Sequence, residues 1–193
     1  MAWLVAGLGN PGERYANTRH NVGAMVAAVL AARSNERFRK VRFIPLEVAE
    51  TRLGDEVVYV ATSHRYMNEA GPSYASFAKK REVAADLVIA IHDDMDLAFG
   101  ALKVKLGGSS AGHNGLKSLQ SALGTPGFLR VRFGVGRPAG RQDPADFVLD
   151  PFAKREQAGV AVLIEEAADV VLSLVRVGLV ATQDRYNRGG AGN

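Results

Sequence analysis

The sequence predicts a single α/β domain in which a twisted, mixed β-sheet is flanked by helices. Strand-like and helix-like segments alternate along the chain without a shift in composition. The 193 residues, 47% of them apolar, are enough for one domain with a full core and short for two. We therefore expect one domain over residues 1–188, followed by a disordered glycine-rich tail at residues 189–193.

In the first half of the chain, apolar runs bounded by turn residues predict strands. The four expected strands are Ala2–Leu8, Arg39–Thr51, Glu56–Thr62 and Asp86–His92. A Leu-Gly-Asp turn joins the second strand to the third, which is typical of a hairpin. Helices are expected over Asn21–Ser34, which is rich in alanine and valine, and over Asn68–Arg81, where Pro72 is tolerated in the first turn.

The second half of the chain continues the alternation. A strand with alternating lysines, Ala101–Leu106, precedes a Gly/Ser loop at residues 107–115 that leads into a helix ending near Leu123. Another strand is expected at Leu129–Val135, and residues 137–143 form a polar loop containing proline and glycine. The chain then ends in a long amphipathic helix and a short helix. These two helices are expected at Lys154–Val177 and Leu179–Arg188.

The composition excludes several classes of protein and site. Because the chain contains no cysteine, it has no disulfide framework, no thiolate nucleophile and no Cys-based metal site. No apolar run approaches the roughly 20 residues of a membrane span. The apolar run at the N-terminus lacks a preceding basic region and predicts a strand rather than a signal peptide. We therefore expect a cytoplasmic protein that does not associate with a membrane.

The chain is basic, with a formal net charge of +4 and a pI near 9.5. On strands, alternation places Lys103 and Lys105 on one face, and it does the same for Arg130 and Arg132. Two basic strand faces are typical of a nucleic-acid footprint, whereas other basic segments are expected to be solvated helix faces and loops. The five basic segments are Arg33–Arg42, Lys79–Arg81, Lys103–Lys105, Arg130–Arg141 and Arg185–Arg188.

Three motifs match known functional patterns but lack the surroundings that those patterns need. The glycines of "GLGNPG", residues 7–12, have the spacing of a dinucleotide fingerprint, yet Pro11 removes an N–H and no helix opens on the last glycine. In "GSSAG", residues 108–112, the only later histidine lies three residues from Ser110, which excludes a triad of the nucleophile-elbow type. The acidic cluster "HDDMD", residues 92–96, has no partner motif for magnesium. We therefore expect no nucleotide cofactor and no metal.

Polar side chains recur just beyond strand ends and at helix starts, where ligands bind in open α/β sheets. Each asparagine, taken singly, is better explained as a turn cap. A histidine and an aspartate in the same place suggest a more specific chemistry. Asp93 can fix the tautomer of His20, whose other nitrogen then takes a proton from water, and an amide or backbone N–H can stabilise the oxyanion. The side chains are Asn10, His20, Asn68, Asp93 and Asn114.

At this point the sequence resembles the bacterial-type peptidyl-tRNA hydrolases. The resemblance runs from residue 3 to about residue 186 and is carried by four segments in order: "GLGNPGERYANTRHNVG", "YMNEAG", "IHDDMDLAFGALKVKLGGSSAGHNGLKSL" and "FLRVRFGVGRP". It implies hydrolysis of the ester between a peptide and the 3′ ribose of tRNA, which recycles tRNA dropped from stalled ribosomes. It also implies a single α/β domain that is monomeric, without an obligate protein partner, and that uses no metal and no cofactor.

The resemblance assigns roles to individual residues. His20 corresponds to the general base, Asp93 to its orienting carboxylate, and Asn10 to a neighbouring catalytic residue. We expect the loss of Asp93 to cost less turnover than the loss of His20, because water can partly solvate the imidazolium. Residues expected to bind the peptide and the tRNA 3′ end are Tyr15, Met67, Asn68, Gly112, His113 and Asn114. Residues expected to bind the acceptor stem and its 5′-phosphate are Lys103, Lys105 and Arg132.

The sequence departs from the family pattern in "SHRYMN", where His64 and Arg65 replace the more usual proline and hydroxyl residues, and Arg65 can change the entry of the peptide channel. A second departure is "SSAG" in the glycine-rich loop. Two alternatives remain: a non-hydrolytic RNA-binding relative on the same scaffold, and a metal-dependent phosphoesterase. Turnover of an N-blocked aminoacyl-tRNA distinguishes the first alternative, and sensitivity to EDTA the second.

Overall fold

The computed structural model describes residues 1–187, so the tail expected at 189–193 lies outside the described residues. A seven-stranded sheet runs through the centre of this part, with the strand order β2-β3-β4-β1-β5-β7-β6. Within residues 1–187, no helix is both long enough and apolar enough to cross a membrane. The strands are β1 (Ala2–Gly7), β2 (Arg39–Lys40), β3 (Leu46–Leu53), β4 (Glu56–Ser63), β5 (Val88–Asp94), β6 (Leu102–Leu106) and β7 (Leu129–Gly134).

The sheet is mixed, as expected. The four central strands β4, β1, β5 and β7 are parallel to one another, whereas β6 pairs antiparallel with β7 and β3 pairs antiparallel with β4. The carboxyl ends of the central strands therefore lie together at one end of the sheet. This is the end at which ligands bind in open α/β folds.

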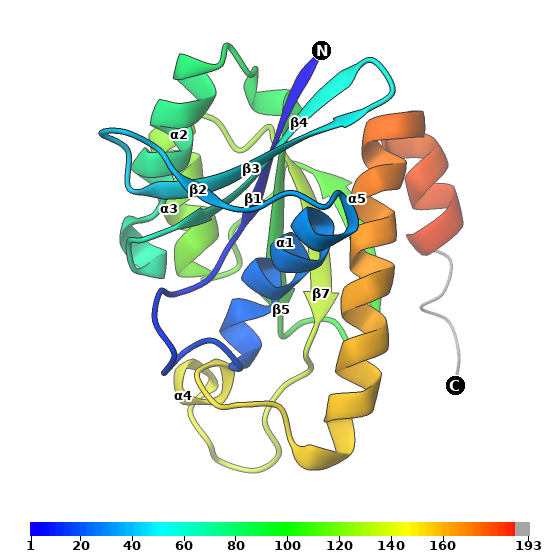
Figure 1. Cartoon of the computed structure of the whole chain (residues 1–193). Coiled ribbons are helices and arrows are strands. Elements are labelled where there is room, and N and C mark those ends of the chain that lie inside the picture. The colour runs from blue at the N-terminus through cyan, green and yellow to red at the C-terminus, as the bar shows by residue number, and fades with distance from the viewer. Residues whose placement is uncertain (188–193) are drawn as a thin grey trace.

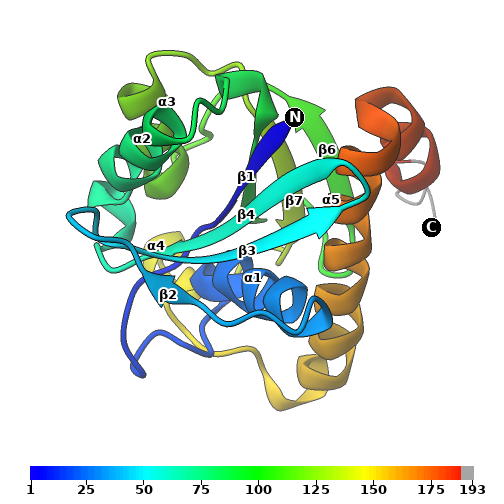
Figure 2. The same ribbon diagram turned by 45° about the horizontal axis from the view of Figure 1, so that its top comes forward.

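Helices cover both faces of the sheet (Figures 1 and 2): α1 and α5 pack on one face, and α2 and α3 on the other. Along β1, Trp3 and Val5 belong to the first core, while Leu4 and Ala6 belong to the second. Burial on both faces explains why this strand is continuously apolar. The helices are α1 (Val22–Arg33), α2 (Gly71–Lys80), α3 (Asn114–Leu123), α4 (Pro144–Val148) and α5 (Gln157–Tyr186).

The prediction of a single strand over residues 39–51 is wrong, because a turn divides this segment into β2 and β3. At the turn, Phe43 adopts a left-handed backbone conformation with φ of 66°. Pro45, which immediately precedes β3, has no N–H to give to a ladder. The two pieces fold back on each other as an antiparallel pair, with Arg39 opposite Val48.

The helices differ from the expectation in two places, and one expected break between helices is present. A 3-10 turn at Met67–Glu69 precedes α2, so the helix expected from residue 68 begins at Gly71. The short helix α4 was not predicted. The break expected between the last two helices is confirmed, because α5 kinks at Gly178, where φ is 81°.

Gly7 and Gly9 of "GLGNPG" serve packing, whereas Gly12 adopts a left-handed backbone conformation with φ of 95°. The helix α1 begins only at Val22, ten residues beyond Gly12, so no helix N-terminus faces the glycine turn. A Cβ on Gly7 would lie 2.5 Å from the backbone oxygen of Gly23, and one on Gly9 would lie 3.1 Å from the side-chain amide of Asn21. The motif thus lets β1 approach the start of α1, which argues against a dinucleotide site.

Candidate active site

A cavity of about 680 Å³ opens at the carboxyl ends of the central strands. All nine residues that the sequence assigned to catalysis and substrate binding line it, and Lys103, Lys105 and Arg132 do not. The wall also includes α4, which supplies Val148. The nine residues are Asn10, Tyr15, His20, Met67, Asn68, Asp93, Gly112, His113 and Asn114.

A buried carboxylate and an imidazole that both line the cavity lie in direct contact. His20 belongs to a 3-10 turn just before α1, and Asp93 is near the end of β5. The Nδ1 atom of His20 lies 2.9 and 3.0 Å from the two carboxylate oxygens of Asp93. The Nδ1–H group therefore donates to Asp93, and Nε2 is left as the basic nitrogen of His20.

A second histidine donates to the same carboxylate. The Nδ1 atom of His113 accepts hydrogen bonds from the backbone N–H groups of Gly115 and Leu116, at 3.1 and 3.3 Å, and so caps α3. An accepting nitrogen carries no proton, which places the ring proton on Nε2. That Nε2–H donates to Asp93 Oδ1 at 2.8 Å. The fold therefore fixes the tautomer of His113 and gives Asp93 two N–H donors.

The environment sets the charge of each group. Burial raises the pKa of Asp93, but His113 and His20 outweigh this, so the pKa is lowered and the carboxylate stays ionised. Burial lowers the pKa of His20, and the charge and hydrogen bond of Asp93 more than offset this, so the net pKa is raised. Burial, reinforced by His113, lowers the pKa of neighbouring His92 to about 3. His92 is therefore neutral at physiological pH.

The ligating atoms of His20, Asp93 and His113 lie within 4.8 Å of one another, close enough to hold a metal ion. However, the Nε2 atom of His113 carries a proton and has no lone pair to offer, because Nδ1 is used by the helix cap. The carboxylates of the acidic cluster at residues 92–96 do not converge on one metal position either. Asp94 pairs with Arg132 and Asp96 with Arg137. The donor set therefore fits a hydrogen-bonded relay better than a metal site.

Asn10 is held by a residue to which the sequence analysis gave no role. The side chain of Asn21 accepts from the Asn10 N–H at 2.9 Å and donates to the Asn10 carbonyl at 2.8 Å. The Asn10 side-chain oxygen accepts from the Met67 N–H at 2.7 Å. Its Nδ2 group is therefore the end of the amide left for a ligand. Gly9 allows this close approach, because a Cβ atom at residue 9 would lie 3.1 Å from the side-chain amide of Asn21.

Arg19 holds α4 in place, the part of the cavity wall that the sequence did not predict. Its buried guanidinium donates to the carbonyls of Phe147 and Asp150 and pairs with Glu156 at 3.2 Å. It also lies 4.0 Å from the centre of the Phe147 ring. These contacts tie α4 to the turn that carries His20. The polar sequence before α4 contains no periodic pattern that predicts this packing.

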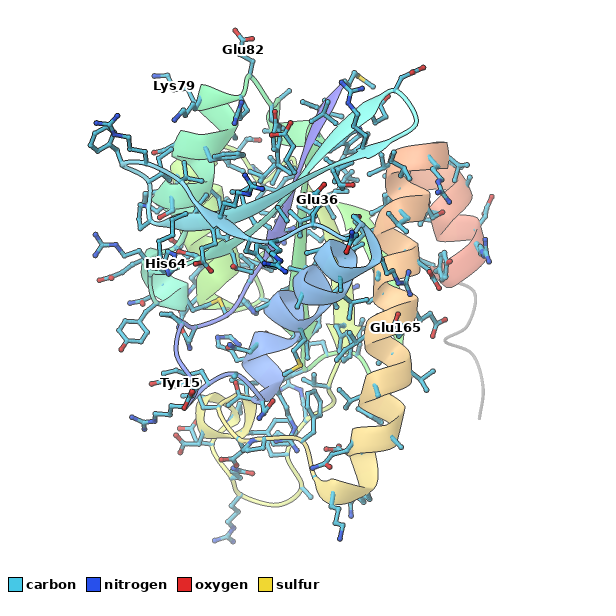
Figure 3. The ribbon with its side chains drawn as sticks, in the orientation of Figure 1. Tyr15, Glu36, His64, Lys79, Glu82 and Glu165 are labelled. Atoms are coloured by element: carbon cyan, nitrogen blue, oxygen red, sulfur yellow. The ribbon has the colours of Figure 1, made fainter. Side chains whose placement is uncertain are left out.

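The remaining substrate-binding candidates lie at the rim. Asn68 and Asn114 are exposed, and both line the cavity and an adjoining hollow. Tyr15, labelled in Figure 3, packs edge to face against Tyr66, with ring centres 6.3 Å apart. Arg65 lies elsewhere: it lines a separate hollow together with Phe43. Its neighbour Tyr66 lines the cavity, and an effect of Arg65 on the channel entry stays a prediction.

The basic strand faces come together at the β6 edge of the sheet. Lys103 lies directly opposite Arg132 in the β6–β7 ladder, and Lys105 directly opposite Arg130. Like charges in opposite positions repel each other, so this edge is suited to an anion. Arg130 is buried and donates to the carbonyls of Gly108 and Ser109, whereas Arg132 gives its Nε–H to Asp94 at 2.8 Å.

Comparisons with known proteins agree with one another. The family model described as "Peptidyl-tRNA hydrolase" matches residues 4–192. The peptidyl-tRNA hydrolase of Nocardia farcinica is 50% identical over 95% of this chain and 95% of its own, and that of Mycobacterium tuberculosis is 47% identical over 95% and 96%. The crystal structure of peptidyl-tRNA hydrolase from Acinetobacter baumannii is similar with a TM-score of 0.89 and 29% identity, over 96% of this chain and 94% of that one.

Proposed function

The chain belongs to the peptidyl-tRNA hydrolase family and hydrolyses peptidyl-tRNA, and from this premise we propose a role for each group in the cavity. The observation that carries the proposal is the hydrogen-bonded series His20–Asp93–His113, in which both ring tautomers are defined. It leaves one imidazole nitrogen, Nε2 of His20, able to accept a proton. The completeness of this series also speaks against a non-hydrolytic RNA-binding relative.

In the proposed mechanism, His20 Nε2 removes a proton from water as the water oxygen attacks the ester carbonyl carbon. The Asp93 carboxylate stabilises the resulting imidazolium through Nδ1–H. The Nδ2 group of Asn10 donates to the developing oxyanion. The intermediate then collapses, the bond to the ribose 3′ oxygen breaks, and His20 returns its proton to that oxygen. The products are tRNA with a free 3′ hydroxyl and a peptide carboxylic acid, which ionises by releasing its proton to solvent.

The rim residues bind the substrate in this proposal. Asn68 and Asn114 have no side-chain hydrogen bonds within residues 1–187, so their amides are available to the peptide and the tRNA 3′ end. Met67 and Tyr15 supply apolar surface, and the Gly112–His113 backbone borders the channel. We place this activity in the cytoplasm, because the substrate is tRNA and the chain lacks cysteine. The monomeric state is what the family resemblance implies.

His113 is a positioning residue with a testable effect on pH dependence. In His113→Asn the shorter amide can still cap α3 but no longer donates to Asp93. The Asp93 carboxylate then stabilises the His20 imidazolium more strongly, which raises the pKa of His20 further. Since the base must be neutral, the acid limb of the kcat/KM profile should move to higher pH, while activity at high pH is retained.

A pH series with a minimal N-blocked aminoacyl substrate measures this shift, and thermal unfolding monitors the cap. His113→Ala is the matched control, because it loses the cap as well and should lower the stability by about 1 kcal/mol. A His113→Asn profile that superimposes on the wild-type profile would show that the bond to Asp93 does not tune His20.

We further propose that Lys103, Lys105 and Arg132 hold the 5′-phosphate of the acceptor stem. Partial burial, and then the guanidiniums of Arg132 and Arg130, lower the pKa of Lys105, so an anion would relieve this cluster. Because Asp94 takes the Nε–H of Arg132, the phosphate would meet the two terminal NH₂ groups of Arg132. The resemblance suggested the residues, and the cross-strand register supports their joint use.

Lys105→Ala and Arg132→Ala should therefore raise KM for full-length peptidyl-tRNA, more at low salt than at high salt. Each lost phosphate contact lowers the slope of log K against log salt by roughly 1. Lys154→Ala, at an exposed position outside the cavity and the β6 edge, is the control for the charge change. A minimal substrate without the 5′-phosphate should be unaffected. Equal losses on both substrates would refute the phosphate role.

A further inference from the structure

We propose that the protein has a second RNA-binding site, a basic groove between β2 and the C-terminal end of α2, which binds the phosphate backbone of RNA away from the acceptor end. The two basic segments at residues 33–42 and 79–81 looked like solvated surface in the sequence, and the fold brings them together here. The inference rests on the tRNA substrate and not on the residue roles proposed above. It concerns a surface remote from the catalytic cavity.

The groove has a volume of about 500 Å³ and an unusual charge. Six basic and two acidic side chains line it, which leaves a net charge of +4, equal to the formal net charge of the whole chain. The rest of the protein is therefore neutral on balance. A polyanion that approaches the molecule is drawn to this groove. The charged lining residues are Glu36, Arg37, Arg39, Lys40, Arg42, Glu50, Lys80 and Arg81.

The basic side chains of the groove have no carboxylate partners. All six are exposed, and none forms an ion pair with another residue within the described range 1–187. Nearby Arg33 differs, because it pairs with both Glu165 and Asp169. Figure 3 shows Lys79, the neighbour of Lys80, projecting from the end of α2. Unpaired cations gathered from two chain segments are suited to several phosphates in a row.

An exposed aromatic ring next to the groove favours RNA over other polyanions. Phe43 at the tip of the β2–β3 turn is 88% exposed, and the guanidinium of Arg42 lies 4.6 Å from the centre of its ring. Its left-handed backbone is unfavourable for a residue with a Cβ atom, and holding a large apolar ring in water adds to the cost. Unpaired bases stack on aromatic and guanidinium planes, so Phe43 and Arg42 offer a stacking surface beside the phosphate site.

The groove cannot share a phosphate with the proposed β6 site. The strands β2 and β6 are the two edges of the sheet, separated by six spacings of about 4.8 Å, or roughly 29 Å. The groove is, however, linked to the cavity along the chain: Tyr66 lines the cavity, and its neighbour Arg65 lines the hollow that contains Phe43. The phosphates in the groove belong either to the body of the bound tRNA or to a separate RNA strand.

The test compares two double variants of the full chain. Arg39→Gln/Lys40→Gln removes two groove cations, and Lys154→Gln/Arg155→Gln removes an adjacent Lys and Arg that are exposed in the 3-10 turn before α5. Fluorescence anisotropy over a salt series measures the binding of full-length tRNA, an acceptor-stem hairpin and a 20-nucleotide unstructured RNA.

We expect the groove variant to lower the slope of log K against log salt by about 2 for the RNA that occupies the groove, with the matched variant unchanged. A loss for full-length tRNA but not for the hairpin identifies the body of tRNA, and a loss for the unstructured RNA alone identifies a separate strand. Unchanged binding of all three RNAs overturns the proposal, as do equal losses in the matched variant. Turnover of a minimal substrate, which reports on the catalytic groups, should stay at the wild-type rate, and a fall would mean that these residues support the cavity instead.

Discussion

His20→Ala should lose turnover of peptidyl-tRNA by about 10²–10⁴-fold, the contribution typical of a positioned general base. The reason is geometric. Nδ1 of His20 is hydrogen-bonded to Asp93. In His113, Nδ1 accepts the hydrogen bonds that cap α3 and Nε2 donates to Asp93. His92 is buried, and its pKa is lowered to about 3. No other imidazole of the cavity can replace the lost base, so the effect should appear in kcat.

Single-turnover hydrolysis measures the chemical step, and the binding of uncharged tRNA should change little. His64→Ala is the matched control, because His64 is an exposed histidine outside the cavity and its nearest carboxylate, Glu47, is 3.7 Å away. The assignment of His20 as base would be abandoned if His20→Ala kept wild-type turnover while His64→Ala behaved in the same way.

Asp93→Asn should cost nearly as much, about 10²–10⁴-fold in kcat. The amide has one accepting oxygen, and this oxygen accepts the hydrogen bond from the fixed Nε2–H of His113. The amide NH₂ group then faces His20 Nδ1, which must become an acceptor. The ring proton of His20 moves to Nε2, and the basic nitrogen no longer faces the substrate.

This expectation differs from the one drawn from the sequence, which assumed that water could replace the Asp93 carboxylate. Asp93 is only 4% exposed, so the Nδ1 side of the His20 ring is shielded from the solvent that would have to replace the carboxylate. Asp94→Asn is the matched control: it breaks the pair with Arg132 and should leave kcat on a minimal substrate unchanged. If Asp93→Asn kept more than a tenth of wild-type kcat, the tautomer argument would fail.

The sequence by itself determined the fold class, and it predicted which residues gather at the site. Continuous apolar runs at β1 and β5 required a sheet buried on both faces, because each strand supplies residues to two cores. The polar residues that follow those strands had to meet at one edge, since parallel strands end on the same side. Asp93 lies at the end of β5, whereas His20 lies in the 3-10 turn before α1, so their pairing was predicted from the polar pattern and the family resemblance together.

Only the tertiary structure decided how those groups interact and what surrounds them. The tautomer of His113 depends on a cap formed with the first turn of α3, and the hold on Asn10 depends on an amide contact with Asn21 across ten intervening residues. The basic groove joins two segments that lie some forty residues apart, because α2 returns along the sheet to meet β2. Local sequence patterns indicate which face of a helix or strand is apolar. Hydrogen-bond partners and charge clusters, however, form between elements, and the packing of the whole chain sets how those elements lie relative to one another.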